Sequence, residues 1–295
     1  MTYIKSIYRW FIRKFNTKVL PSFVKSPKVI SREQTVKRIH GSGLSISRFG
    51  DGEFRIIYGK SISFQEYDSR LKSRLIEVIK SKNQRHMVCI PDVFSSLDKF
   101  NENAKFFWSE YVSYHRYKIY SLLTRRFIYG DSLVTRPYMD RIDKDKSYLH
   151  FKNLMSIWRD KDLLIVEGRY SRLGVGNDLF AESKSIKRIL CPEQNCFSYY
   201  DNILASVLDE SRERLVLIAL GPTATVLAYD LCLKGVQALD IGHLDVEYEW
   251  MKMRAIVKAP IPNKYVNETV ATNKIKYPED SRYREQIVFE VEGNE

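Results

Sequence analysis

The chain has 295 residues, of which 44% are hydrophobic and 28% are charged, a balance typical of a globular protein with a full-sized core. This composition excludes a wholly disordered or low-complexity chain, and the length allows one large domain or two modest ones. Lysine and arginine exceed aspartate and glutamate by 48 − 36 = 12, so the surface should attract anions such as nucleotides, nucleic acid or anionic lipid. The 4 cysteines show neither a disulfide framework nor paired C-x-x-C spacing, which predicts reduced thiols in a cytoplasmic protein.

Residues 1–23 mix aromatic and basic side chains and lack the uncharged apolar block of a secretory signal. Trp10 and Phe11, for example, stand beside Arg9, Arg13 and Lys14. Two interpretations stay open: a helix that lies on an anionic membrane surface, such as the inner face of the plasma membrane, or a peripheral helix packed on the domain. The pattern divides the chain into a basic amphipathic extension, residues 1–30, and a single domain, residues 31–295.

Beyond the extension, strand-like and helix-like patterns alternate. Strands are predicted at residues 44–49, 86–90, 163–166, 186–191, 215–220 and 238–241. Helices are predicted at residues 32–40, 67–80, 102–120, 200–209 and 223–234, with a further short one at 179–185. The polar tail from residue 263 onward is expected to be irregular. This order predicts an α/β fold with a mainly parallel sheet covered by helices, in which ligands bind at the carboxyl ends of the strands.

The first candidate site follows the strand predicted at residues 44–49. Asp51 and Glu53, one residue apart, can both face a hard cation such as Mg²⁺ or Mn²⁺, which prefers oxygen ligands. Gly50 lets the backbone turn tightly and lets a ligand approach closely. Arg48 is placed to neutralise phosphate, with Phe49 as its neighbour in the site. The alternative is an ordinary solvated turn, the commonest setting of such a pair.

The second candidate is the loop after the strand predicted at residues 163–166. It leads toward the short helix predicted at 179–185, whose free backbone N–H groups would form an anion site, with arginines to pair with phosphate. The expected nucleotide contacts are Arg169, Arg172, Gly174, Gly176, Asn177 and Asp178. Neither a Walker A nor a dinucleotide fingerprint is completed, so a plain glycine turn with surface arginines is the alternative.

Two further segments offer weaker candidates. A strand turns through Gly-Pro into a helix with Thr223 as its predicted N-cap, and this helix start either faces a nucleotide or is simply a capped turn. Arg136, just before a proline, either contacts the donor or acceptor of a reaction or belongs to a loop anchored by hydrogen bonds.

An acidic run, residues 240–250, combines four carboxylates with one histidine. If the run is extended, its alternate residues share one face; if it is helical, His243 pairs with Glu247 and Asp245 with Glu249. Either geometry places His243 where it can ligate a metal, and it leaves carboxylates for base catalysis.

Together these motifs resemble the glycosyltransferases of the GT-D fold, a group long catalogued as a domain of unknown function. The matching segments are RFGDGE at residues 48–53, GDSLVTRPY at 130–138, RLGVGNDLF at 172–180, LGPTA at 220–224 and DIGHLDVEYEW at 240–250. The resemblance covers residues 32–261. It implies one α/β domain with a Rossmann-like sheet, and a metal-dependent, inverting transfer of a hexose from a UDP-sugar to a hydroxyl of a glycan on a protein or lipid carrier.

The resemblance also implies roles for particular residues. Asp51 and Glu53 would hold Mn²⁺ or Mg²⁺ against the diphosphate, and His243 would be a further metal or diphosphate contact. The base would lie in the acidic run: Glu249, with Asp245 as the first alternative.

Two other classes of function stay open. A metal-dependent phosphohydrolase or nucleotidyltransferase would use the same carboxylates. The net charge favours a nucleic-acid-binding protein, but the basic residues are scattered and no recognised binding motif is present, so we expect no nucleic-acid partner. The aromatic segment at residues 108–120 is consistent with a homodimer.

Overall fold

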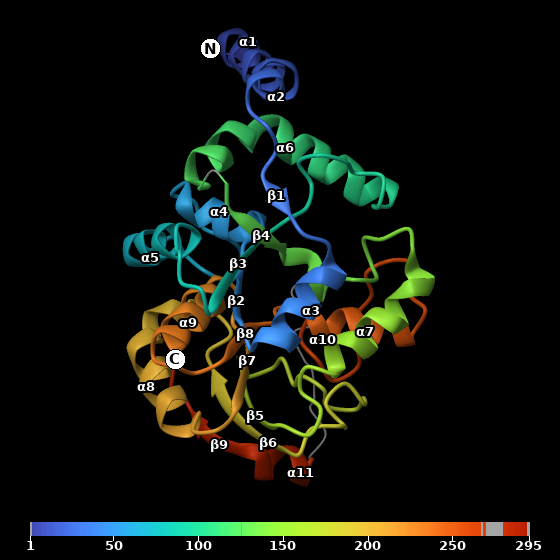
Figure 1. Cartoon of the computed structure of the whole chain (residues 1–295). Helices are drawn as coiled ribbons and strands as arrows, with labels where there is room; N and C mark the ends of the chain where they lie inside the picture. The colour runs from blue at the N-terminus through green and yellow to red at the C-terminus, as the bar shows by residue number, and fades with distance from the viewer. Residues whose placement is uncertain (1, 125, 267, 270–279, 294–295) are drawn as a thin grey trace.

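The computed structural model describes residues 2–124, 126–266, 268–269 and 280–293. In this part of the chain a nine-stranded sheet has the order β1-β4-β3-β2-β8-β7-β5-β6-β9 (Figure 1). Every neighbouring pair of strands in it is parallel. The predicted α/β class and parallel sheet are therefore confirmed.

The six predicted strands form within two residues of their expected bounds. They are β2 (Ser45–Arg48), β3 (His86–Ile90), β5 (Asp162–Gly168), β6 (Ser185–Cys191), β7 (Leu215–Ala219) and β8 (Ala238–Asp240). Three outer strands are not predicted: β1 (Lys28–Val29), β4 (Ile128–Asp131) and β9 (Ile287–Glu290). The expectation of an irregular tail is wrong for its last part, where helix α11 (Ser281–Gln286) precedes β9 and β9 pairs with β6.

Helices cover both faces of the sheet, because alternate side chains of each buried strand enter different cores. In β5, Leu164 and Val166 join one hydrophobic cluster, and Leu163 and Ile165 join the other. The first cluster is covered by α4 (Asp51–Ile57), α5 (Ser69–Ile79), α6 (Glu102–Leu122), α8 (Tyr200–Glu210) and α9 (Pro222–Leu233). The second is covered by α3 (Arg32–Ser42), α7 (Ser147–Met155) and α10 (Leu244–Lys252).

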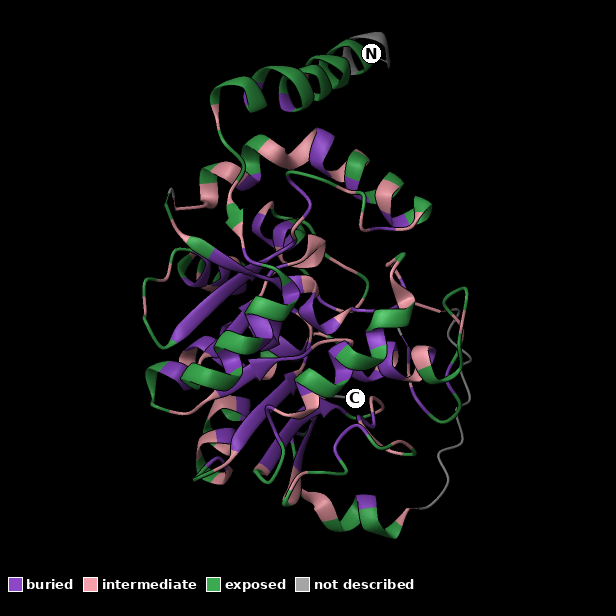
Figure 2. Cartoon of the chain, turned by 45° about the vertical axis from the view of Figure 1, so that its right-hand side comes forward, coloured by how far each residue is buried: buried purple, intermediate pink, exposed green. Residues whose placement is uncertain are grey.

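The N-terminal extension is largely helical and packs on α6. It comprises α1 (Thr2–Lys14), a π-helical turn (Phe15–Val19) and α2 (Leu20–Phe23), and it is mostly exposed in Figure 2. Lys28 and Val29, which belong to the extension predicted over residues 1–30, pair with β4. Among the described residues, no helix is both long and apolar enough to cross a membrane.

Candidate functional site

A pocket opens where β2 and β8 run side by side in the sheet. From β2 the chain moves outward to β3, whereas β7 and β5 lie beyond β8, so the strand order reverses between β2 and β8. Ligands of open α/β sheets bind at the carboxyl ends of the strands at such a point. The pocket has a volume of about 900 Å³ and is lined by residues that follow these two strands.

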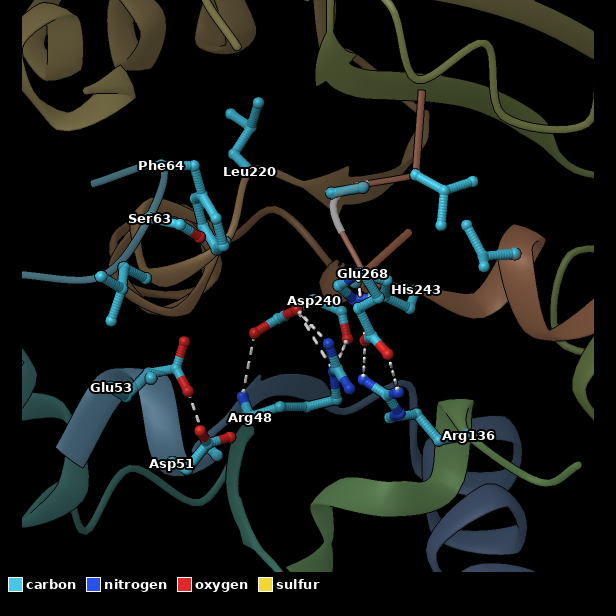
Figure 3. Close-up of a pocket in the computed structure, with 18 of the residues that line it drawn as sticks. Arg48, Asp51, Glu53, Ser63, Phe64, Arg136, Leu220, Asp240, His243 and Glu268 are labelled. Atoms are coloured by element: carbon cyan, nitrogen blue, oxygen red, sulfur yellow. Dashed lines mark hydrogen bonds and ion pairs between the residues drawn. The ribbon is translucent and has the colours of Figure 1, made fainter. Parts of the chain in front are cut away.

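Arg48, the last residue of β2, is joined to Asp240, the last residue of β8 (Figure 3). Its Nη2 lies 3.1 Å from Oδ1 of Asp240, and its backbone N–H donates to Oδ2 at 3.1 Å. Nη1 of Arg48 donates to the carbonyl oxygen of Ser132 at 3.1 Å and to the hydroxyl of Thr135 at 2.6 Å. Arg48 lines the pocket as predicted, but its guanidinium is held by protein groups, and its clearest role is to connect three loops.

Two glycines line the pocket at positions where neighbouring side chains leave no space for a Cβ atom. Gly242 follows β8 with φ +45°, and a Cβ there would lie 1.8 Å from Nη2 of Arg48. Gly221 precedes α9 with φ +55°, and a Cβ there would lie 2.5 Å from the ring of Phe64, which lines the pocket. Both positions therefore need glycine for its left-handed backbone and for space.

Asp51 and Glu53 belong to the first turn of α4, which begins just after β2. Oε2 of Glu53 accepts the N–H of Gly50 at 2.6 Å and so caps the helix. Burial, together with the charges of Asp240 and Asp51, raises the pKa of Glu53 to about 7, and burial also raises the pKa of Asp51. The surrounding protein thus offsets the negative charge of these two carboxylates only in part.

Glu268 enters the pocket from the C-terminal part of the chain and is surrounded by basic groups. Its carboxylate accepts from Nη1 and Nη2 of Arg136 at 2.7 and 3.0 Å. Nζ of Lys258 lies 2.5 Å from Oε2, and Nε2 of His243 lies 3.5 Å from Oε1. Burial alone would raise the pKa of Glu268, but Arg136, His243 and Lys258 lower it far below its usual range. This side of the pocket therefore binds an anionic group.

The acidic run is helical from Leu244 onward, so the helical alternative is correct. Asp245 accepts hydrogen bonds from the N–H of Gly174, from Nδ2 of Asn177 and from Nζ of Lys264, at 2.8, 2.8 and 2.7 Å. Glu249, one turn further along, accepts from Asn177 at 2.7 Å and from Lys264 at 2.9 Å. Asp245 lines the pocket.

Glu247, a third carboxylate of α10, supports the turn that carries Arg136. It is fully buried and accepts the backbone N–H groups of Tyr138 and Met139, both at 2.9 Å. Its Oε1 lies 3.7 Å from Nε of Arg136. Glu247 therefore orients Arg136, whose guanidinium reaches the pocket.

The glycine loop before β6 is engaged with the protein. The helix predicted at residues 179–185 is wrong: turns fill this stretch until β6 begins at Ser185. Gly174 and Gly176, which precede this stretch, have φ of +72° and +80° and so are not helical either. The N–H groups of Leu173 and Gly174 are directed at the carboxylates of Glu167 and Asp245 rather than left open for a phosphate.

Eight predicted site residues lie outside the pocket lining: Arg169, Arg172, Gly174, Gly176, Asn177, Asp178, Thr223 and Glu249. Arg172 is buried, with its guanidinium 4.8 Å from the centre of the Tyr283 ring. Nε of Arg169 lies 4.0 Å from Oε2 of Glu290. Asp178 accepts from Tyr248 and Lys252, at 2.9 and 2.7 Å. Thr223 is fully buried in α9 and is not the N-cap, because Gly221 holds that position and Pro222 follows it.

Sequence reasoning missed the basic and acidic residues that the C-terminal segment adds to the site. These are Lys258, Lys264 and Glu268. They lie in polar sequence whose local pattern is that of a solvated tail. One feature of the sequence could have identified the lysines: they follow the acidic run. Buried carboxylates need cations close by, so nearby lysines are candidate partners.

Residues 46–269 match the sequence profile of the family described as "Glycosyltransferase GT-D fold". The chain is 44% identical over 261 residues to the "Probable glycosyl transferase Gly" of Streptococcus gordonii, and 41% identical over 260 residues to "Glycosyltransferase GlyD" of Streptococcus pneumoniae serotype 4. Each alignment covers 88% of this chain, but the chain spans only 38% and 32% of the length of these relatives.

Solved structures give the same result. One, described as "The highly conserved domain of unknown function 1792 has a distinct glycosyltransferase fold", matches with a TM-score of 0.87 at 41% identity over 96% of this chain and 99% of that chain. "A New Glycosyltransferase (DUF1792) from Streptococcus sanguinis" matches with a TM-score of 0.87 at 42% identity over 90% and 100% of the two chains. The chain belongs to the family of glycosyltransferases with the GT-D fold.

The close passage of Arg48 past Gly242 predicts a large loss of stability for Gly242→Ala. A left-handed alanine costs about 1–2 kcal/mol, and displacing Arg48 from buried Asp240 should add about 3 kcal/mol. Gly43→Ala is the matched control, since its φ is +61° and nothing lies within 4 Å of a Cβ there. Urea unfolding measures both. Equal losses in the two variants would show that the Arg48 contact is unimportant.

Proposed function

We propose that the protein transfers a hexose from a UDP-sugar to a hydroxyl group of a glycan, with inversion at the anomeric carbon and with Mn²⁺ or Mg²⁺ bound. The observation that carries this proposal is the division of charge in the pocket. Asp51 and Glu53 present partly uncompensated carboxylates, and Arg136, Lys258 and His243 surround an anionic group. A metal-bound diphosphate needs both kinds of partner.

Asp51 and Glu53 fit a hard divalent cation, because both offer carboxylate oxygens and one oxygen of Glu53 is not used by the Gly50 cap. No group of three or more His, Cys, Asp or Glu side chains placed to hold a metal ion occurs among the described residues. We therefore assign His243 to the diphosphate. A cation held by two carboxylates would complete its shell with phosphate oxygens and water, as Mg²⁺ commonly does. When bound, it would offset the charge that develops on the leaving diphosphate.

Glu268 occupies the place that we assign to the diphosphate. A diphosphate offers more negative charge and more acceptor oxygens than one carboxylate, and Arg136 can bind it through the same two nitrogens. Binding of the donor would thus exchange one anion for another at Arg136 and Lys258. The basic groups remain paired in either state, so this side of the site stays ordered without donor.

Inversion requires a single displacement, in which the acceptor hydroxyl loses its proton and attacks the anomeric carbon opposite the leaving UDP. We assign the base to Asp245, since it lines the pocket, in place of Glu249. Three donors hold the carboxylate of Asp245 in one orientation at the wall of the pocket. No covalent intermediate between sugar and protein is then needed.

We place this reaction in the cytoplasm, with a glycan on a protein or lipid carrier as acceptor. The four cysteines support a reducing compartment, because all are free thiols buried in the fold.

Binding of UDP tests the donor site. UDP should bind with Mn²⁺ present and at least about tenfold more weakly without it or in Asp51→Asn, a loss of about 1.4 kcal/mol. Titration calorimetry measures the Kd for UDP, GDP and ADP. Asp201→Asn is the control, since Asp201 is an exposed carboxylate on α8 that pairs with Arg70. UDP binding that ignores both Mn²⁺ and Asp51 would contradict the proposal, and phosphate release without an acceptor would favour a phosphohydrolase.

The kcat of sugar transfer tests the base. Asp245→Asn should lower kcat by about 10²–10⁴-fold, because general base catalysis has this size. Glu249→Gln is the matched variant, since Glu249 shares Asn177 and Lys264 with Asp245, and it should lower kcat far less. UDP binding and thermal unfolding of both variants show whether the site is intact. A larger loss in Glu249→Gln would move the base to Glu249.

A further inference from the structure

Helix α1 presents its large apolar side chains to solvent rather than to the protein. Tyr8, Trp10 and Phe11 are 65%, 54% and 59% exposed. A helix on the surface of a globular protein ordinarily turns such a stripe toward the core. In Figures 1 and 2, α1 lies beyond α6 at the N-terminal end of the molecule, away from the sheet.

Two contacts between α1 and α6 use basic side chains of α1. Nη2 of Arg13 lies 2.6 Å from Oε1 of Glu110 on α6. The guanidinium of Arg9 lies 5.2 Å from the centre of the Tyr114 ring, also on α6. These contacts fix the rotation of α1 about its axis and so hold the aromatic stripe outward.

The π-helical turn after α1 continues this attachment. Asn16 is buried there, its Nδ2 donating to the carbonyl oxygen of Ser113 at 3.0 Å, and its Oδ1 accepting the N–H of Tyr117 at 2.8 Å. Two hydrogen bonds at one buried side chain hold the segment in place. The outward stripe continues past this point with Phe23, which is 84% exposed.

Charge identifies what covers this stripe. The first 30 residues contain seven lysines and arginines and no aspartate or glutamate, which is more than half of the net charge of +12. Nζ of Lys14 lies 4.7 Å from the centre of the Trp10 ring, so a cation borders the stripe. A second copy of the chain would bring two such segments of like charge together, whereas anionic lipid complements both the charge and the apolar stripe.

We propose that α1 docks on an anionic lipid surface, with its aromatic stripe in the interface and its flanking cations at the headgroups. Helix α6 connects this surface to the site, because Phe107 and Trp108 at its other end line the pocket. Docking therefore holds the transferase site beside the membrane and does not change its chemistry.

Vesicle sedimentation of the full chain tests the docking. The protein should sediment with vesicles of phosphatidylcholine and phosphatidylglycerol, far less with phosphatidylcholine alone, and less at high salt. Trp10→Ser combined with Phe11→Ser should weaken partitioning by about tenfold or more, since two aromatic rings are lost from the interface. Lys14→Glu combined with Lys18→Glu should weaken binding to the vesicles that contain phosphatidylglycerol, but not the weak binding to vesicles of phosphatidylcholine.

Tyr148→Ser combined with Leu149→Ser is the matched control, because these side chains of α7 are 56% and 62% exposed and should leave sedimentation unchanged. Thermal unfolding should be similar in all variants, as every substituted side chain is exposed. Equal binding to both vesicle types, or wild-type binding by the Trp10 and Phe11 variant, would overturn the proposal. A dimer in sedimentation velocity that this variant dissociates would also overturn it, because a second copy would then cover the stripe.

Discussion

The ion pair between Arg48 and Asp240 is the contact on which the candidate site depends. It joins the carboxyl ends of β2 and β8 at the point where the strand order reverses. Burying two opposite charges is costly unless hydrogen bonds satisfy both, and here backbone and hydroxyl groups complete the set. Three loops are fixed by this one pair: the turn into α4, the turn before Arg136 and the glycine turn before α10.

These loops determine the division of charge in the pocket. The first supplies Asp51 and Glu53, and the other two supply Arg136 and His243. The C-terminal segment completes the site: Lys264 offsets the charges of Asp245 and Glu249, and Glu268 satisfies Arg136. The basic groups of the site are thus paired within the protein, with one carboxylate where we place the substrate's diphosphate. In the proposed reaction, binding of the donor would exchange that carboxylate for the diphosphate and would not require a new pocket to assemble.

Much of this arrangement could be predicted from the sequence, because parallel strands end at one edge of a sheet. That rule brings Asp51 and His243 into one pocket although they are 192 positions apart. The roles of individual side chains could not be predicted, since they depend on partners distant in sequence. Arg48, for example, lies close in sequence to the predicted metal ligands Asp51 and Glu53, which suggests that it binds phosphate. In the structure it binds Asp240 instead.

The glycine loop shows the same limit. The local sequence suggests that the backbone N–H groups of this loop are free to bind phosphate. In the structure, Asp245 of the distant helix α10 accepts the N–H of Gly174. The sequence of the acidic run is compatible with either a strand or a helix. In the structure it forms α10, which packs against α7. The sequence around Glu268 has no hydrophobic periodicity that would predict burial. Only the three-dimensional structure shows its contact with Arg136.

The most direct test is a crystal structure of the protein with UDP and Mn²⁺. We predict a metal ion in contact with Asp51 and Glu53, the diphosphate on Arg136 and Lys258, and the carboxylate of Glu268 displaced from Arg136. A diphosphate bound elsewhere, with Glu268 still paired to Arg136, would contradict the assignment of this pocket as the donor site.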